Sequence, residues 1–383
     1  PKGGVGKSTL STNVAGYYAS QGHPVILGDV DPQKSAHLWL SLRPATVAPI
    51  GRWDTDVDAL AKPPKGTTHA VLDTPAGLHG GAGASEALLP LDLGPTRMPA
   101  LLLMGSDEPG RFSAAQGTDL LRVTQDRVNE KRFINDHGTP TAPWKAVNSV
   151  EELEAALDEI HYPAVLKTRS GGYDGHGQTV LKSEADLEQV RARADHDGSF
   201  PPSILEGFVD FAFEASILVA GNGKNYVTFP IVRNEHRNNI LHMTIAPAEV
   251  DETVAKEAHE LALRLAKGFE LAGILAIELF ITKDNKVIVN ELAPRPHNSG
   301  HYTIEACSFD QFDAHIRGIA GWPLEQPQLL KPAVMVNVLG QHVAPTRALI
   351  AEHPEWSMHD YCKAEVRHDR KMVPKLFHLI LNL

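Results

Sequence analysis

Two glutamates in the second half of the chain are spaced so that a β-hairpin would place them face to face. The stretch AIELFITKDNKVIVNELAP has an apolar segment on each side of the polar turn sequence KDNK, which predicts two antiparallel strands. A two-residue turn at Asp284-Asn285 would set Glu278 directly opposite Glu291. Opposed carboxylates repel unless a cation lies between them, and Mg²⁺ prefers carboxylate and phosphate oxygens. We therefore predict a metal site here rather than an exposed edge with scattered acids, because both flanking segments are too apolar to face solvent.

A glycine-rich loop upstream has the composition of a phosphate-binding element. The apolar stretch YPAVLK predicts a strand that ends in Lys167, and GGYDGHGQ follows at once. Glycines allow the backbone to fold closely over phosphates, and Lys167 would contact the α- and β-phosphates. Further along, ILEGFV is expected to offer backbone groups to an adenine edge, and Glu214 to accept from a ribose hydroxyl. Alone, the loop also fits a mobile surface turn, but the lysine and the downstream acid pair favour nucleotide binding.

A second phosphate-binding pattern opens the chain. GGVGKST, from Gly3 to Thr9, has the glycines and the G-K-[ST] ending of the G-x-x-x-x-G-K-[ST] motif, in which Lys7 would reach the outer phosphates and Ser8 would bind Mg²⁺. Lys2 adds a second cation before the glycines. Three aspartates that follow predicted strands are candidates for orienting the metal or water: Asp29, Asp31 and Asp73.

These N-terminal stretches resemble the deviant-loop ATPases of the ParA/MinD family over about residues 1–80. In that family a strand precedes the loop, and base-binding elements follow the Asp73-type strand. Neither is found in this sequence, so we favour the interpretation that 1–80 is a fragment that keeps the motif without the sheet that shapes it. A working partition ATPase is the alternative.

Composition bounds the remaining functions. The chain has 383 residues, which predicts two or three domains, and a formal net charge of -11, which argues against a general nucleic-acid or membrane-surface binder. Only two cysteines occur, with no CxxC pattern, so a disulfide framework or cysteine zinc site is not expected. We see neither a signal peptide nor an apolar run of transmembrane length. These features predict a cytoplasmic protein.

The elements that would position the candidate residues follow from periodicity. Residues 1–80 are expected to be α/β, and 81–112, rich in Gly, Ala and Pro, to be a linker or junction. Residues 113–138 predict a helix ending at a left-handed glycine, and SVEELEAALDEI begins with a capping box at Ser149 and Glu152. One face of the helix predicted over 251–273 is apolar: Val254, Ala258, Leu261, Leu265 and Phe269.

From about residue 113 to 372 the chain resembles the N5-carboxyaminoimidazole ribonucleotide synthetases, a family of ATP-grasp enzymes. The resemblance is carried by TQDRVNEKRF, YPAVLKTRSGGYDGHGQ, ILEGFVDF, NEHRNNILHMTIAP, NELAPRPHNSGHYTIEAC and KAEVRHDRKM. It implies an α/β and α+β fold in which two α+β subdomains enclose the nucleotide. The expected domains are a P-loop segment at 1–80, a junction at 81–112, an ATP-grasp domain at 113–315 and a C-terminal subdomain at 316–383.

The resemblance also assigns site residues. Those implied to bind ATP are Arg127, Lys167, Gly172, Tyr173, Asp174, Gly175, His176, Gly177, Gln178, Glu206, Gly207, Phe208, Val209, Glu214, His236, Asn290 and Glu291. Those implied to line the bicarbonate and carboxyphosphate pocket, and hence to be catalytic, are Arg295, His297 and Asn298. Those implied to hold the ribonucleotide phosphate are Lys363, Arg370 and Lys371. Glu278 and Glu291 match the family's Mg²⁺ ligands, with Mn²⁺ as an alternative metal. Outside the motifs, each histidine would be an ordinary packed or loop residue, Tyr173 could simply pack, and Arg127 would be a solvated helix charge.

The implied reaction joins bicarbonate to 5-aminoimidazole ribonucleotide at the expense of ATP, through carboxyphosphate, in purine biosynthesis. The partners are these three small molecules, with no nucleic acid and no membrane, and a homodimer is expected. The chain departs from the family at both ends: we find no family-type N-terminal domain, and the tail after Met372 looks foreign. Carboxylation is therefore less secure than ATP binding, and an inactive ATP-binding fusion is a further alternative.

Overall fold

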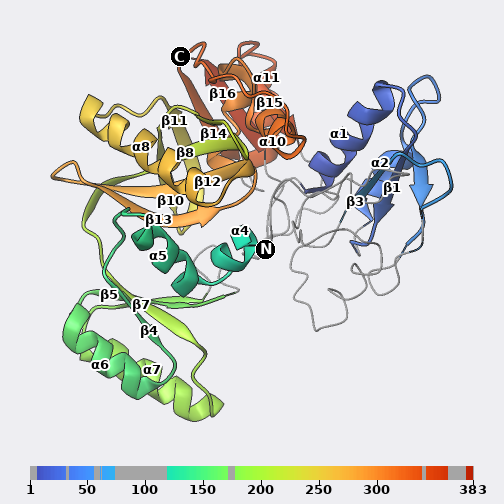
Figure 1. The fold of residues 1–383 in the computed structure, drawn as a ribbon. Helices are drawn as coiled ribbons and strands as arrows, with labels where there is room; N and C mark the ends of the chain where they lie inside the picture. Colours follow the sequence, from blue (N-terminus) through green and yellow to red (C-terminus); the bar gives the residue numbers. More distant parts are fainter. Residues whose placement is uncertain are drawn as a thin grey trace. The chain divides into compact units, whose positions relative to one another are not determined.

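A computed structural model of the protein describes residues 7–31, 34–55, 61, 63–73, 119–170, 177–338, 342–360 and 377–382. The chain divides into two compact units, Pro1–Thr118 and Asp119–Leu383 (Figure 1). Each unit has its own sheets and its own core.

The first unit is an α/β layer. Its described strands form a three-stranded parallel sheet in the order β2-β1-β3, and buried Ile26, Trp53 and Leu72 are part of its core. The elements are α1 (Lys7–Ser20), β1 (Val25–Asp29), α2 (Ser35–Ser41), β2 (Gly51–Trp53) and β3 (His69–Asp73). The short apolar runs VILGD and HAVLD are fully or nearly fully buried, as strands of a covered parallel sheet must be. The α/β prediction for this segment is confirmed.

The second unit contains two antiparallel sheets. Within the described residues, the smaller sheet has four strands in the order β4-β7-β5-β6, and α6 and α7 lie beside it (Figure 1). Its elements and those that lead into it are α4 (Asp119–Thr124), α5 (Arg127–Asp136), β4 (Trp144–Val147), α6 (Val150–Ile160), β5 (Ala164–Thr168), β6 (Gln178–Leu181), α7 (Glu184–Asp197) and β7 (Ser203–Gly207).

The larger sheet has nine strands in the described part of the unit, in the order β13-β12-β8-β10-β11-β14-β16-β15, with β9 paired to β8. Its elements begin with β8 (Phe211–Asn222), β9 (Tyr226–Thr228), β10 (Val232–Arg237), β11 (Ile240–Ala246), α8 (Glu252–Gly268), β12 (Ala272–Thr282) and β13 (Val287–Ala293). They continue with η2 (Asn298–Gly300), α9 (Thr303–Ala306), α10 (Gln311–Ile319), β14 (Ala333–Val338), α11 (Val343–Ile350), β15 (Ser357–Asp360) and β16 (Phe377–Asn382).

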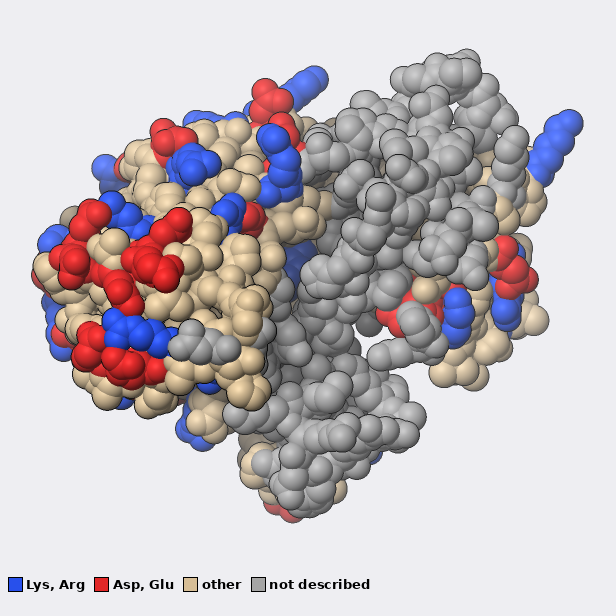
Figure 2. Space-filling view, turned by 90° about the horizontal axis from the view of Figure 1, so that it is seen from below, with Lys and Arg blue, Asp and Glu red and all other residues tan. Residues whose placement is uncertain are grey.

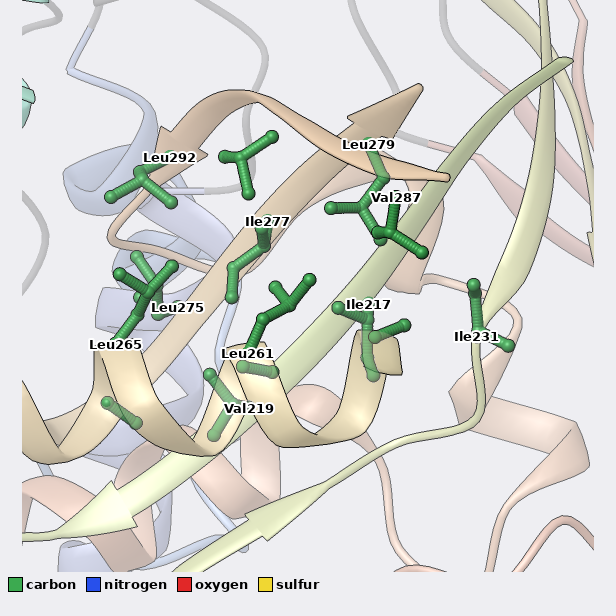
Figure 3. Packing of buried hydrophobic residues seen from close by; sticks show 14 of the residues in the cluster. Ile217, Val219, Ile231, Leu261, Leu265, Leu275, Ile277, Leu279, Val287 and Leu292 are labelled. Carbon is green, nitrogen blue, oxygen red and sulfur yellow. The ribbon is translucent and has the colours of Figure 1, made fainter. Parts of the chain in front are cut away.

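Helix α8 covers one face of this sheet. Leu261 and Leu265 of α8 point toward Ile217 and Val219 of β8 and toward Leu275 and other apolar residues of the β12–β13 hairpin (Figure 3). The predicted apolar face of this helix is confirmed, since Val254, Ala258, Leu261, Leu265 and Phe269 are all buried. This core packs against β12 and β13, the strands that carry the two candidate metal ligands.

The hairpin has the predicted pairing of its glutamates, but its turn length and its register near the turn differ from the prediction. Glu278 pairs with Glu291, as expected, but Leu279 pairs with Val289, so the register shifts by one residue next to the glutamates. Near the turn, Asn285 has a positive φ of 61° and its N–H donates to the Thr282 carbonyl, which makes the connection three residues long instead of two. The two-residue turn was wrong, and the β-bulge at Asn290 restores the register.

Two other expectations differ from the structure. The helix predicted over 113–138 is two helices, because Asp126 caps α5 by accepting from the N–H groups of Val128 and Asn129. Gly138 has the expected left-handed φ, 66°. In the C-terminal segment that looked foreign, the described residues Phe377–Asn382 form β16, which pairs with both β14 and β15 inside the larger sheet.

Charged side chains of both signs lie on the described surface. Figure 2 shows acidic and basic side chains interspersed over the described face, with no broad basic patch there. Among the described residues no helix has the length and apolar character to cross a membrane.

A buried histidine predicts how the second unit responds to acid. His315 of α10 is fully buried, and its Nδ1 accepts a hydrogen bond of 3.0 Å from the Ile274 N–H of β12. Burial lowers the pKa of His315 to about 4. In the unfolded chain this histidine takes up a proton below about pH 6.5, whereas in the folded protein it stays neutral down to about pH 4. The free energy of unfolding is therefore unaffected above about pH 6.5 and decreases as the pH falls toward 4. Over that window we expect a loss of order 3 kcal/mol in the free energy of unfolding.

Chemical unfolding at pH 7 and pH 4.5 would measure this loss. A His315→Asn variant should be less stable than the wild type at pH 7 and should lose less stability between the two pH values. An equal pH dependence in both proteins would contradict the assignment.

Candidate active site

Helix α5 brings Arg127 to the glutamate hairpin. The Asp126 cap sets the start of the helix, and the Asp126 carboxylate also accepts three hydrogen bonds from Arg169, at 3.2, 3.0 and 2.6 Å. Arg127 Nη1 lies 3.0 Å from Glu291 Oε2. Burial alone would lower the pKa of the Arg127 guanidinium, but the charges of Glu291 and Glu130 outweigh burial and raise it. The guanidinium is therefore a fixed positive charge beside a candidate metal ligand.

Two lysines share one buried carboxylate. Glu206 of β7 is 3% exposed, and its Oε2 lies 3.0 Å from Lys167 Nζ and 3.2 Å from Lys131 Nζ. Burial would raise the pKa of Glu206, but the two ammonium groups lower it. Burial, Lys131 and Arg127 lower the pKa of Lys167 despite the attraction of Glu206. The Lys167 charge is held in a site with little solvent, where its interaction with an anionic ligand would be strong.

The facing glutamates each have a cationic or polar neighbour. Glu278 Oε1 lies 3.2 Å from His297 Nε2, and its Oε2 accepts a long hydrogen bond of 3.4 Å from Asn290 Nδ2. Burial would raise the pKa of Glu278, but the hydrogen bond from His297 and the charges of His297, His236 and Arg295 lower it to about 2. Glu278 is thus an ionised acid at neutral pH, with Glu291 paired to it across the hairpin.

The loop after β13 carries the predicted catalytic residues. His297 precedes η2, and its backbone is fixed by Gln311, whose Oε1 accepts from the His297 N–H at 2.8 Å and whose Nε2 donates to the His297 carbonyl at 2.9 Å. Burial lowers the pKa of Arg295 although Glu291 and Glu278 act in the opposite direction. In the described part of the chain, the buried Oδ1 of Asn298 has no hydrogen-bond partner. This atom is an acceptor that a bound ligand could satisfy.

Two further predicted nucleotide contacts lie side by side. His236 Nδ1 of β10 is 2.6 Å from Glu214 Oε2 of β8. The neighbouring strand contacts explain this closeness, because Asn234 pairs with Glu214 in the sheet. Glu278 and Phe280 of β12 also flank β8 here. The structure therefore brings Glu214 and His236 to the same part of the sheet as Glu278.

The remaining predicted residues divide into described and undescribed positions. Gly177 and Gln178 lie at the start of β6, where Gln178 pairs with Lys167. Gly207 ends β7, followed by Phe208, which is 50% exposed, and Val209. The predictions outside the described residues are Gly172, Tyr173, Asp174, Gly175, His176, Lys363, Arg370 and Lys371.

The N-terminal predictions have mixed outcomes. Lys2, the loop glycines and the side chain of Lys7 lie outside the described residues. Asp29 and Asp73 pair in register and are buried. Asp29 accepts from the N–H groups of Asp31 and His37, and Asp73 accepts from Ser11 Oγ at 3.3 Å. These bonds hold α1 and α2 to the ends of β1 and β3.

Sequence reasoning missed Glu130 and Lys131. Both are buried on α5, at 2% and 1% exposure, although neither was assigned a role. A signal was available: Lys131 is three residues from both Val128 and Ile134, which are buried, so it occupies an apolar-face position of the helix. A charged residue at such a position must find buried partners.

The side chains of this site could hold a divalent cation only together with oxygen atoms of a bound ligand. Among the described residues, no group of three His, Cys, Asp or Glu side chains could hold a metal ion alone. Glu278 and Glu291 nevertheless supply two carboxylates from directly paired positions, and the bulged residue Asn290 lies next to Glu291 on β13. Mg²⁺ is commonly held by one or two carboxylates together with substrate phosphates. The residues therefore fit a magnesium–nucleotide complex.

Two family models, a curated relative and solved structures match this chain. The ATP-grasp domain family matches residues 132–312, and the phosphoribosylaminoimidazole carboxylase C-terminal domain family matches residues 333–373. An N5-carboxyaminoimidazole ribonucleotide synthase of Bacillus subtilis (strain 168) is 45% identical over 262 residues, 67% of each chain. A synthetase crystal structure with ADP has a TM-score of 0.75 and 32% identity, covering 98% of this chain and 90% of that one. A second such structure, from Staphylococcus aureus with ADP, has a TM-score of 0.75 and 30% identity, covering 100% and 91%.

The structural matches correct our interpretation of the first unit. Because the two synthetase structures cover 98% and 100% of this chain, the α/β unit corresponds to the Rossmann-like domain with which the synthetases begin. The comparisons give no support to a separate ParA/MinD-like fragment, and the inference that the family's N-terminal domain is missing was wrong. A short loop motif cannot distinguish among folds that share parallel strands and covering helices. The chain belongs to the N5-carboxyaminoimidazole ribonucleotide synthase family of ATP-grasp enzymes, ATP-dependent ligases of purine biosynthesis.

Proposed function

We propose that this chain carboxylates the exocyclic amine of 5-aminoimidazole ribonucleotide with bicarbonate and ATP. A bicarbonate oxygen attacks the γ-phosphorus, the bond to the ADP oxygen breaks, and carboxyphosphate forms. Carboxyphosphate then yields CO₂ and phosphate, and the amine forms the new C–N bond and loses a proton. The observation that supports this proposal most directly is the pairing of Glu278 with Glu291 beside Arg127.

The cations of the site suit the transferred phosphoryl group. Arg127 and Lys167 are candidates for the phosphate oxygens, because preorganised charges stabilise phosphoryl transfer without reorganising water. Arg295 lies on the loop after β13, and burial keeps its charge poorly solvated. We assign Arg295 and His297 to bicarbonate and carboxyphosphate, with Asn298 Oδ1 as an acceptor.

Glu278 and Glu291 would hold Mg²⁺, or Mn²⁺ in its place, together with the nucleotide phosphates. The metal would supply charge neutralisation on the phosphate oxygens. In this assignment the Arg127 contact with Glu291 and the His297 contact with Glu278 keep each carboxylate oriented. Asn290 would contact ATP near its phosphates.

The adenine end is assigned to the end of β7. Glu206 Oε1 is buried and has no hydrogen-bond partner among the described residues, so it can accept from an exocyclic amine. Phe208, half exposed, and Val209 offer apolar contact, and Glu214 with His236 is placed near the ribose and phosphates. The ribonucleotide phosphate is assigned to Lys363, Arg370 and Lys371. A cytoplasmic location and a homodimer stay predictions.

The decisive experiment measures phosphate release from ATP with each substrate omitted in turn. We expect release that requires bicarbonate and rises with 5-aminoimidazole ribonucleotide, with the carboxylated product detected by mass spectrometry. ADP binding without bicarbonate-dependent turnover would leave only an ATP-binding protein. Addition of DNA should not change the rate.

A further inference from the structure

Two buried charges adjoin the site without a part in the chemistry proposed above. Glu130 and Lys131 are consecutive residues of α5, and less than one twentieth of either is exposed. Buried charges are costly unless they are paired or bonded, so their partners show what they do.

The partners lie on either side of Glu291. Lys131 Nζ donates a 2.8 Å hydrogen bond to the Asn290 carbonyl, and Glu130 Oε1 accepts a 2.9 Å hydrogen bond from the Leu292 N–H. Arg127, one helical turn earlier, contacts the Glu291 carboxylate itself. Helix α5 therefore binds three successive residues of β13, two through the backbone and one through its side chain.

The position of β13 explains why such contacts are needed. In the described part of the sheet β13 is the outermost strand, so its outer backbone groups have no neighbouring strand to bind. The bulge at Asn290 also interrupts the regular ladder with β12. The Val289 N–H donates to the Pro140 carbonyl. Lys131 and Glu130 of α5 bond to the next outer groups, which are the Asn290 carbonyl and the Leu292 N–H. An edge strand with a bulge would otherwise be the least constrained support for a metal ligand.

Lys131 also reaches the other sheet. Its ammonium lies 3.2 Å from Glu206 Oε2, the same oxygen that Lys167 contacts at 3.0 Å. One side chain thus joins the backbone next to Glu291 to the carboxylate that orients Lys167. Lys131 therefore contacts both the strand that carries the candidate metal ligand and the carboxylate that pairs with the candidate phosphate cation.

We propose that Glu130 and Lys131 are positioning residues that fix Glu291 for divalent-cation binding and couple it to Lys167. This inference rests on the proposed function, since it takes Glu291 as a metal ligand. Residues that orient metal ligands commonly change metal affinity by about 10- to 100-fold when they are removed. Glutamine has nearly the same shape as glutamate and keeps the side-chain oxygen that accepts from the Leu292 N–H, so Glu130→Gln preserves this contact.

The test compares Glu130→Ala with Glu130→Gln. In the ligand-free protein, Glu130→Ala should speed hydrogen exchange of the Leu292 amide. With saturating ADP, its Mn²⁺ affinity, measured by electron paramagnetic resonance, should fall about 10- to 100-fold. Glu130→Gln keeps an oxygen acceptor and should stay within a few-fold of the wild type. Lys131→Met should weaken Mn²⁺ binding as well. If Glu130→Ala does not fold, Mn²⁺ affinity is measured in Lys131→Met instead.

His315→Ala is the matched control. It removes another buried side chain that accepts from a strand N–H, at Ile274 of β12, four residues before Glu278. It should lower the unfolding temperature and leave Mn²⁺ affinity unchanged. Equal weakening by His315→Ala, or unchanged affinity in folded Glu130→Ala and Lys131→Met, would overturn the positioning role while the proposed function stands. No Mn²⁺ binding by the wild type with ADP would instead refute the proposed function.

Discussion

Replacing Lys167 by methionine should lower kcat/KM for ATP by about 10²- to 10³-fold, or ~3–4 kcal/mol of transition-state stabilisation. Methionine keeps most of the side-chain volume, so the change removes the charge from a site where burial makes that charge effective. Glu206 retains its contact with Lys131, so its carboxylate is not left unpaired. The measurement is initial-rate kinetics at saturating bicarbonate and aminoimidazole ribonucleotide, together with calorimetric titration of ADP.

Two control variants make the Lys167 result specific. Lys167→Arg keeps the positive charge but not the compact ammonium, so we expect partial recovery of ADP affinity and little recovery of turnover. Lys7→Ala, in the N-terminal glycine motif, should leave both ADP affinity and turnover within about twofold of the wild type, because all the proposed nucleotide contacts belong to the second unit. Loss of turnover in Lys7→Ala with retention in Lys167→Met would place nucleotide chemistry in the first unit.

The glutamate hairpin shows how far strand pairing and turn length can be predicted from sequence. The pairing of Glu278 with Glu291 was predicted from two apolar segments and an assumed two-residue turn, and that turn was one residue too short. The pairing was still correct because the bulge at Asn290 offsets the longer turn. A bulge depends on the backbone contacts of one residue, and no residue type marks it reliably.

The parts of the site that sequence did not reveal are contacts between distant segments. Glu130 and Lys131 bind residues about 160 positions away, and nothing in a local window specifies such a partner. The first unit illustrates the opposite error, because a strong local motif suggested a separate protein fragment. A motif of seven residues constrains one loop, whereas the three-stranded sheet and its helices decide the fold.

The second large effect should come from the facing acids. Glu278→Gln keeps the shape of the side chain and removes the charge that His297, His236 and Arg295 stabilise. Because the pKa of Glu278 lies near 2, the wild-type carboxylate is ionised throughout the neutral range, and the charge lost at pH 7 is a full one. We expect turnover to fall by about 10³-fold or more, or ~4 kcal/mol, and the Mg²⁺ concentration for half-maximal activity to rise.

A double-variant cycle separates a shared metal from two independent contributions. If both acids hold one cation, Glu278→Gln with Glu291→Gln should cost little more than either single change, because the second substitution acts on a site already lost. Thermal unfolding without nucleotide would confirm that each variant folds. Strictly additive losses, with an unchanged Mg²⁺ requirement in both single variants, would mean that the two carboxylates do not share a metal and that their pairing serves the hairpin alone.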